Sequence, residues 1–112
     1  MIPCRVSKVE ENGFIKITEG IDRKAVVYGK ETLLCEFKLE KNAVIPMHEH
    51  PHEQTGFLVS GKVLFTIDGK EYEMKAGDTW CILGNVEHKA KVLENSFIIE
   101  VFSPVREEFI NK

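Results

Sequence analysis

Residues 56–83 read GFLVSGKVLFTIDGKEYEMKAGDTWCIL, which is four short strand-like runs separated by turn signals. Gly61 separates the first two runs, and Asp68-Gly69 separates the second from the third. Asp-Gly is a strong hairpin signal, because both central residues of a type I′ turn need a positive φ. Ala76-Gly77-Asp78 is another turn signal before the last run. This segment therefore predicts successive short strands joined by tight turns.

Similar runs lie on both sides of this segment. In residues 32–39 the apolar side chains alternate, and four of them share one face: Leu33, Cys35, Phe37 and Leu39. Residues 89–93 and 96–103 form two further runs, which Glu94-Asn95 separates. Only residues 106–110 could form a turn of helix. Many short strands with regular turns predict an all-β sandwich or barrel.

The chain has 112 residues, enough for one domain and too few for two, and no repeat or linker divides it. We therefore predict a single domain over residues 1–112, with an N-terminal strand region and a short C-terminal tail. The run at 96–103 carries apolar side chains on both faces. One face would fill the interior while the other packs against a second sheet or a second subunit, so we expect a homodimer.

Composition and charge argue against several classes of partner. The formal net charge is −3 and no run of Lys or Arg stands out, whereas nucleic-acid binding needs a basic stripe. No apolar run is long enough to span a bilayer, and the N-terminus lacks the regions of a signal peptide, so we expect a cytoplasmic protein. The cysteines, Cys4, Cys35 and Cys81, are predicted to be reduced thiols. Cys81 is interpreted as a small buried side chain, with a place near a metal as the alternative.

Three of the four histidines fall within five positions, in the segment PMHEHPHEQ of residues 46–54. Residues two apart in an extended strand point to the same side, so His48 and His50 are predicted to face inward together. Two neutral imidazoles placed in this way can share one borderline metal ion. His88 lies on a later strand and can close the site from across the barrel. A histidine pair alone is a weak signal, but this combination predicts a metal site.

The third ligand from this segment is left open between two residues. Glu53 has the wrong parity for a regular strand, and His52 has the right parity but directly follows Pro51, where the chain is expected to bend. Gln54 is preferred, through its amide oxygen, and His52 would then be a wall of the pocket or a neighbour of the ligands. The predicted metal ligands are His48, His50, Gln54 and His88.

At these residues the chain resembles a cupin, a fold that is a double-stranded β-helix or jelly-roll barrel. The first cupin motif is glycine, five residues, HxH, three or four residues, glutamate, six residues and glycine. It is met at His48, His50 and Gly61, with Asn42 at the first glycine and Gln54 at the glutamate. The second motif is met at Gly77 and His88, whereas Leu83, Asn85 and Val92 replace its proline, second glycine and asparagine.

A narrower resemblance is to the KdgF-like cupins of pectin and alginate breakdown. It rests on HEHPHEQ at 48–54, GNVEH at 84–88 and EVFSPVRE at 100–107. That family opens the ring of 4,5-unsaturated monouronates and gives linear 4-deoxy-5-keto-uronates. The resemblance implies the same four metal ligands and a pocket acid, aromatic residue and arginine at Glu100, Phe102 and Arg106. The acid is usually aspartate in that family.

These residue types suit such chemistry. Neutral ligands would leave the metal its full +2 charge, which attracts a substrate carboxylate and polarises an oxygen. Arg106 can clamp a carboxylate, or it can be a surface arginine beside Glu107 and Glu108. Glu100 shares a face with Phe102. Facing an apolar interior, Glu100 would have a raised pKa suited to proton transfer; facing outward, it would be a solvated surface residue.

The resemblance favours a metal-dependent enzyme that acts on a small anionic substrate and holds one divalent ion (Ni, Zn, Mn, Fe or Co). Its catalytic residues would be Glu100 and Arg106, and its substrate contacts Phe102, Arg106 and His52. An Fe(II) dioxygenase of a small organic substrate and a non-catalytic sugar- or metal-binding module are the alternatives. A binding module would not need an ionisable group in its pocket. Trp80 and Tyr72 could stack on a sugar, but both are predicted to pack in the core or an interface.

Overall fold

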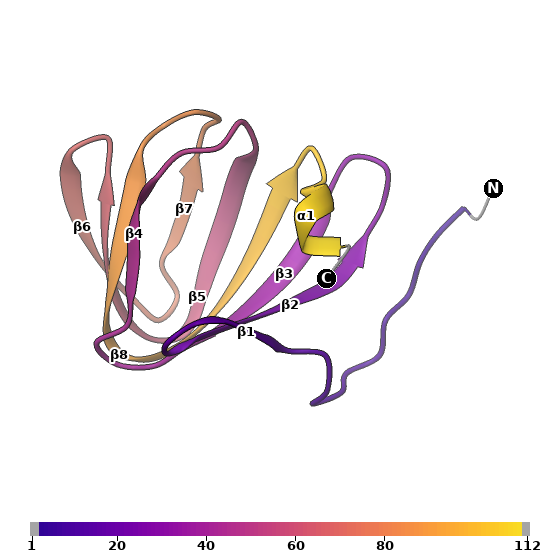
Figure 1. Cartoon of the computed structure of the whole chain (residues 1–112), viewed down its shortest axis with the longest axis horizontal. Coiled ribbons are helices and arrows are strands. Elements are labelled where there is room, and N and C mark those ends of the chain that lie inside the picture. The colour runs from indigo at the N-terminus through magenta and orange to yellow at the C-terminus, as the bar shows by residue number, and fades with distance from the viewer. Residues whose placement is uncertain (1–2, 111–112) are drawn as a thin grey trace.

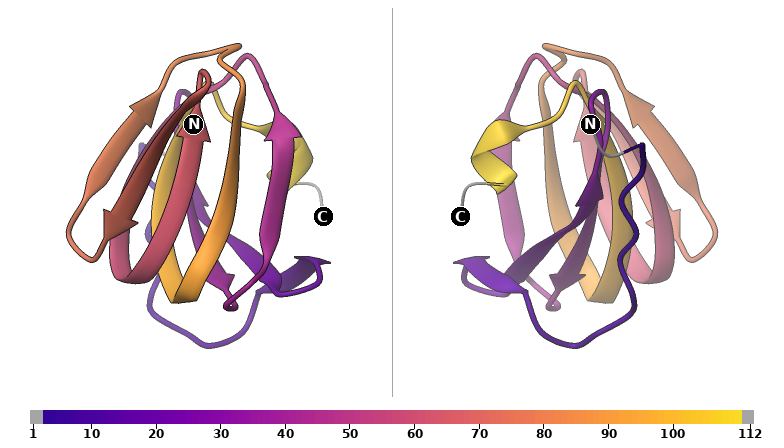
Figure 2. Two further views of the ribbon diagram at one scale, coloured as in Figure 1. Left: turned by 90° about the vertical axis from the view of Figure 1, so that its left-hand side faces the viewer. Right: turned by 90° about the vertical axis from the view of Figure 1, so that its right-hand side faces the viewer.

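Two long, bent strands, β5 (Glu53–Ile67) and β8 (His88–Ser103), organise the computed structural model, which describes residues 3–110. The other elements are β1 (Ile15–Thr18), β2 (Ile21–Tyr28), β3 (Leu33–Leu39), β4 (Val44–His48), β6 (Lys70–Lys75), β7 (Thr79–Ile82) and the helix α1 (Glu107–Ile110). All strand pairs are antiparallel. The ribbon views in Figure 1 and Figure 2 show these strands curving around a common interior.

Each long strand contributes one half to each of two layers. Residues 96–103 of β8 pair with β3 and with residues 53–60 of β5, which also pair with β7. In the second layer, residues 88–94 of β8 pair with residues 62–67 of β5. This part of β8 also pairs with β4, and this part of β5 also pairs with β6. The outer strands β1 and β2 extend the first layer beyond β3. This sharing of two strands wraps the sheet around its buried apolar residues, which form two clusters that Phe37 contacts in common, as a jelly-roll barrel requires.

Two predicted strand breaks were wrong. Gly61 and Glu94-Asn95 do not end strands but lie opposite each other where β5 and β8 bend together. Gly61 has a φ of 99°, and a Cβ there would overlap Ser96 and the Asn95 carbonyl. The Ser96 hydroxyl oxygen accepts a hydrogen bond from the Lys62 N–H at 3.0 Å, so it replaces a ladder bond at the bulge. A glycine at a bulge gives the same local signal as a glycine in a turn.

Other local predictions are confirmed. Asp68 and Gly69 have φ values of 51° and 81°, as the type I′ hairpin requires. In β8, Ile98, Glu100 and Phe102 face the interior, whereas Ile99 and Val101 between them are only half-buried. The expected turn of helix is present as α1. The N-terminal strand region, predicted without bounds, contains β1 and β2, and the inward-facing Arg23 breaks the alternation of apolar residues in β2.

The interpretation of Cys81 as a buried side chain was wrong. Cys81 is an exposed residue of β7. Trp80 and Ile82 on either side of it point into the core, so the alternation of the strand turns Cys81 outward. Cys4, Cys35 and Cys81 are all free thiols, and Cys35 is buried. Among residues 3–110, no helix has the length and apolar character needed to cross a membrane.

Substituting Gly61 should test how far the fold depends on the shared bend. Gly61→Ala places a Cβ where Ser96 and the backbone already lie, whereas Gly77, with a similar φ of 96°, has open space around it. Both substitutions strain the backbone, but only the first also overpacks it. We expect Gly61→Ala to lose about 1–3 kcal/mol more unfolding free energy than Gly77→Ala. Denaturant unfolding of both variants measures this difference, and equal losses would contradict the role given to the bend.

Candidate metal centre

Three histidines from two distant stretches of the chain converge. His48 ends β4, His50 lies in the loop after it, and His88 begins β8. Their potential ligand atoms all lie within 4.8 Å of one another. The ring centroids are 4.1 Å apart for His48 and His88, 5.0 Å for His50 and His88, and 5.5 Å for His48 and His50. The predicted convergence of histidines from two distant stretches is therefore present.

The local route to this cluster differs from the prediction. His48 and His50 were expected on one extended strand, but β4 ends at His48 after an irregularity in its pairing with β8. His50 reaches the cluster from the loop instead. That loop is fixed, because the N–H of Asn85, which has a φ of 64°, donates a 2.7 Å hydrogen bond to the His50 carbonyl. Gly84 packs so closely on the Pro51 carbonyl that a Cβ would overlap it.

Backbone carbonyls orient all three rings. The Nδ1 atoms of His48, His50 and His88 lie 2.9, 2.9 and 2.8 Å from the carbonyl oxygens of Pro46, His52 and Val86, respectively. A carbonyl only accepts, so each Nδ1 carries the hydrogen and each Nε2 keeps its lone pair. The Nε2 atoms of His50 and His88 are buried and have no hydrogen-bond partner among the described residues. Converging, unpartnered lone pairs of this kind fit a divalent transition metal.

The protonation of the cluster also suits a metal. Burial, followed by the nearby charges of Arg106 and His88, lowers the pKa of His50 to about 4. Burial also lowers the pKa of His88. Both rings are therefore neutral near neutral pH, which is the form that binds metal.

Gln54 and Glu100 form a buried polar pair beside the histidines. Glu100 is 7% exposed, so of the two orientations left open the structure has the inward one. Its Oε2 accepts hydrogen bonds from Gln54 Nε2 at 2.7 Å and from Trp80 Nε1 at 2.8 Å. Burial raises the pKa of Glu100, and the two hydrogen bonds oppose that shift. The amide of Gln54 uses its nitrogen in this pair, so its oxygen stays available as a ligand.

The hydrogen bond from Trp80 was not predicted. Trp80 packs in the core against Phe65, with ring centroids 4.7 Å apart, as expected, but its N–H also reaches across β5 to Glu100 on β8. Gly56 is the β5 residue paired with both, and a Cβ there would overlap the indole. The sequence carries no local signal for this contact, because the three residues meet only through strand pairing. Tyr72, by contrast, is 41% exposed.

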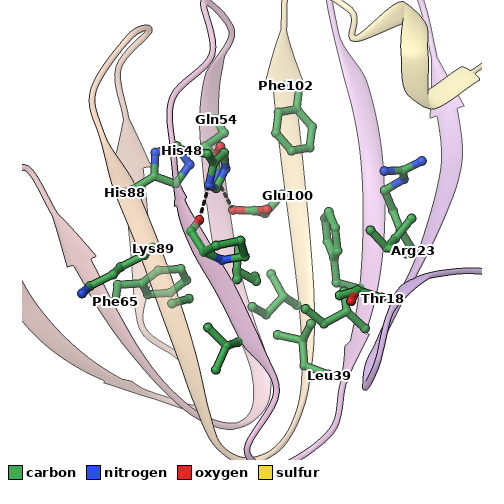
Figure 3. A pocket seen from close by; sticks show the side chains of 18 of the residues that line it. Thr18, Arg23, Leu39, His48, Gln54, Phe65, His88, Lys89, Glu100 and Phe102 are labelled. Carbon is green, nitrogen blue, oxygen red and sulfur yellow. Dashed lines mark hydrogen bonds between the residues drawn. The ribbon is translucent and has the colours of Figure 1, made fainter.

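A cavity of about 280 Å³ lies beside the cluster (Figure 3). Its lining includes predicted site residues and the unpredicted Arg23: Arg23, His48, Gln54, His88, Glu100, Phe102 and Arg106. Figure 3 shows Glu100 and Phe102 between the histidines on one side and Arg23 on the other. His50 and His52 are not part of this lining. The structure thus brings together most of the residues that were singled out from the sequence.

Two further predicted site residues, Arg106 and His52, lie outside the three-histidine cluster. Arg106 donates through Nε and Nη2 to Glu108 Oε2 at 3.1 and 3.0 Å, and it stacks over Phe102 and Phe109 at 5.1 and 4.0 Å. Arg106 thus pairs with a neighbouring acid and also lines the cavity. His52 is outside the three-histidine group, with its ring centroid 5.8 Å from that of His50.

A sequence model of the cupin domain, Cupin_2, matches residues 35–102. The chain belongs to this cupin family. The cupin is 27% identical over 103 residues to the pectin degradation protein KdgF of Dickeya dadantii (strain 3937), which covers 90% of the chain and 94% of KdgF.

Two solved structures share both fold and sequence with this cupin. KdgF from Halomonas sp. superposes with a TM-score of 0.88 at 27% identity, over 94% of this chain and 97% of that one. An RmlC-like cupin from Shewanella frigidimarina NCIMB 400 gives a TM-score of 0.87 at 28% identity, over 92% and 93% of the two chains. The resemblance to KdgF-like cupins that the three motifs indicated is thus confirmed.

Removing one histidine ring should show whether the three-histidine cluster, rather than the neighbouring His52, binds the metal. His50→Ala deletes one of the three converging lone pairs and should weaken divalent-metal binding by more than about tenfold. His52→Ala is the matched control, because it keeps the backbone carbonyl that orients His50. Metal content after equilibration with Zn²⁺ or Ni²⁺, measured by mass spectrometry, provides the comparison. Equal metal loss in both variants would show that the cluster is not the site.

Acid should destabilise the metal-free cupin through the same histidines. The unfolded chain takes up a proton at the ordinary pKa of 6.5, whereas folded His50 resists protonation until about pH 4. The contribution of His50 to stability is therefore present above pH 6.5 and is lost as the pH falls through about 4. Unfolding in urea with a chelator, at about pH 7.5 and about pH 4.5, should show a smaller loss for His50→Asn than for the unaltered chain. An equal loss would contradict the assignment.

Proposed function

We propose that this cupin holds one divalent transition metal through His48, His50, His88 and Gln54 and opens the ring of an unsaturated uronate. The observation that supports the proposal best is the position of a buried carboxylic acid, Glu100, in the cavity that His48 and His88 of the three-histidine cluster also line. The similarity to KdgF, named as a pectin degradation protein, supports an acidic sugar as the substrate. The product would be the linear 4-deoxy-5-keto-uronate.

The four ligands would all be neutral, so the ion would keep its full +2 charge. When bound, Ni, Zn, Mn, Fe or Co would supply Lewis-acid polarisation of a substrate oxygen. Gln54 suits the fourth position, because its Nε2 is held by Glu100 and this fixes the orientation of the amide. In place of the glutamate of the general cupin motif, Gln54 also removes one negative charge from the site. That charge would otherwise repel an anionic substrate.

Glu100 would move the proton. Ring opening is an isomerisation, in which a proton leaves a sugar hydroxyl and one is added to a carbon of the double bond. Oε2 is held by two donors, whereas Oε1 has no hydrogen-bond partner among residues 3–110 and is not fully buried, so Oε1 would be the atom that exchanges a proton in the cavity. Burial raises the pKa of Glu100, which favours the protonated form and suits the group to proton transfer.

Phe102 and Arg106 would position the substrate in this proposal, and His52 would orient a metal ligand. Phe102 is 2% exposed and lies 6.1 Å from the His50 ring, so it would form an apolar wall against the sugar. Arg106 keeps Nη1 free of the Glu108 bonds and would contribute positive charge. His52 lies farther away and would act through its carbonyl, which orients His50.

Glu100 also bears on the alternatives. A sugar- or metal-binding module would not need a buried acid, which costs free energy to enclose. A dioxygenase would show substrate-dependent oxygen consumption, whereas ring opening consumes no oxygen. The buried acid with one atom facing the cavity favours proton-transfer chemistry over both.

We further propose a homodimer and a cytoplasmic location. The outer face of the layer containing β7 carries exposed apolar side chains, among them Phe57 and Val59. A second subunit would cover such a patch. The free thiols are typical of a reducing compartment.

Glu100→Gln tests the proposed role directly. The glutamine oxygen can still accept the hydrogen bonds from Gln54 and Trp80, so fold and metal content should be unchanged. Turnover of a 4,5-unsaturated monouronate, followed by the loss of enol absorbance, should fall by at least about a hundredfold. Glu94→Gln is the matched control, an exposed residue of the same strand. Full activity in Glu100→Gln would rule the role out, and oxygen uptake by the unaltered chain would favour the dioxygenase.

A further inference from the structure

Arg23 is a buried cation without an anionic partner in the described part of the chain. It lies on β2, is 4% exposed and lines the same cavity as His48 and Glu100. Its Nη2 has no hydrogen-bond acceptor, and no carboxylate of residues 3–110 lies within ion-pair distance of its guanidinium. A buried charge is costly unless it is paired, so a cavity that keeps one unpaired calls for a ligand that supplies the missing charge.

The surroundings of Arg23 orient its guanidinium. The Phe109 ring lies 3.6 Å from Cζ, so it covers one face of the guanidinium and leaves the N–H edge without an acceptor. The charged and titratable groups near it are Cys35, Arg106 and Glu108. Cys35 is neutral at ordinary pH, because burial raises the pKa of its thiol to about 12. Glu108 is held by two hydrogen bonds from Arg106. None of these neighbours neutralises Arg23.

The two arginines of the cavity therefore differ in how many of their hydrogen-bond donors are free to bind a ligand. Arg106 has already committed Nε and Nη2 to Glu108. Arg23 has an open donor and a ring stacked on one side, which is the arrangement in which a guanidinium binds a carboxylate. Figure 3 shows Arg23 across the cavity from His48 and His88, with Glu100 and Phe102 between them.

We propose that Arg23 anchors the carboxylate of the substrate, an inference that rests on the proposed function and specifies how the acidic sugar is held. The carboxylate would lie at the Arg23 end of the cavity rather than at the metal ligands. The uncharged oxygen atoms of the sugar would then face the histidines, and the reacting carbon would lie near Glu100. Arg23 is thus a specificity-determining residue, which selects an acidic sugar over a neutral one.

Equilibrium binding of a non-reactive probe tests this anchor without relying on turnover. The metal-loaded full chain is titrated calorimetrically with D-galacturonate and, separately, with its methyl ester, which lacks the charge. We expect the unaltered chain to prefer the acid by at least about tenfold. Arg23→Gln should abolish that preference with metal content unchanged. Lys30→Gln, at an exposed position after β2, removes the same charge and should keep the preference.

The outcomes separate this proposal from the proposed function. If Arg23→Gln keeps the preference of the unaltered chain, or if the unaltered chain has none, Arg23 is not the anchor. If Arg23→Gln fails to fold, Arg23→Lys replaces it: a single ammonium should keep only part of the preference, and a fully retained preference overturns the proposal. An Arg23-dependent preference in a chain that does not convert unsaturated monouronates would contradict the ring-opening reaction alone.

Discussion

Each clustered histidine is bound at Nδ1 by a backbone carbonyl two residues away, and the chemistry of the site depends on these three contacts. They fix the tautomer as well as the direction of each ring, so that the Nε2 lone pairs converge. Without them the rings could rotate, and a binding geometry would have to be formed at the expense of side-chain entropy. The loops that supply two of these carbonyls, those of His52 and Val86, are tied together by the Asn85–His50 backbone hydrogen bond. The site is therefore organised by main-chain structure before any ion is bound.

A second constraint lies across the strands rather than along them. Glu100, Gly56 and Trp80 form one row over β8, β5 and β7, in which the missing side chain of Gly56 lets the indole reach the acid. Gln54 belongs to the next inward-facing row and completes the contacts of Glu100 Oε2. The fold tolerates this acid in an apolar interior because its Oε2 accepts two hydrogen bonds. The remaining oxygen is left for the cavity.

The charge of the cavity is opposite to that of the whole chain. The protein carries a formal net charge of −3, yet its cavity is lined by Arg23 and Arg106, and burial holds Glu100 toward its neutral form. Such separation keeps acidic groups at the surface and concentrates positive potential in the enclosed space. A positive cavity of this kind would favour a small anion, in line with the proposed acidic substrate.

The amino-acid sequence by itself determined the strand-rich fold, the Asp68-Gly69 hairpin, the inward side of β8 and the histidines that would meet, because these follow from local alternation, turn chemistry and motif spacing. The continuity of β5 and β8 through Gly61, the placement of His50 on a loop, the Trp80–Glu100 bond and the unpaired Arg23 were decided only by the tertiary structure. All four depend on which strands lie side by side and on what covers each residue. Pairing and burial join residues far apart in the chain, and no local pattern records them.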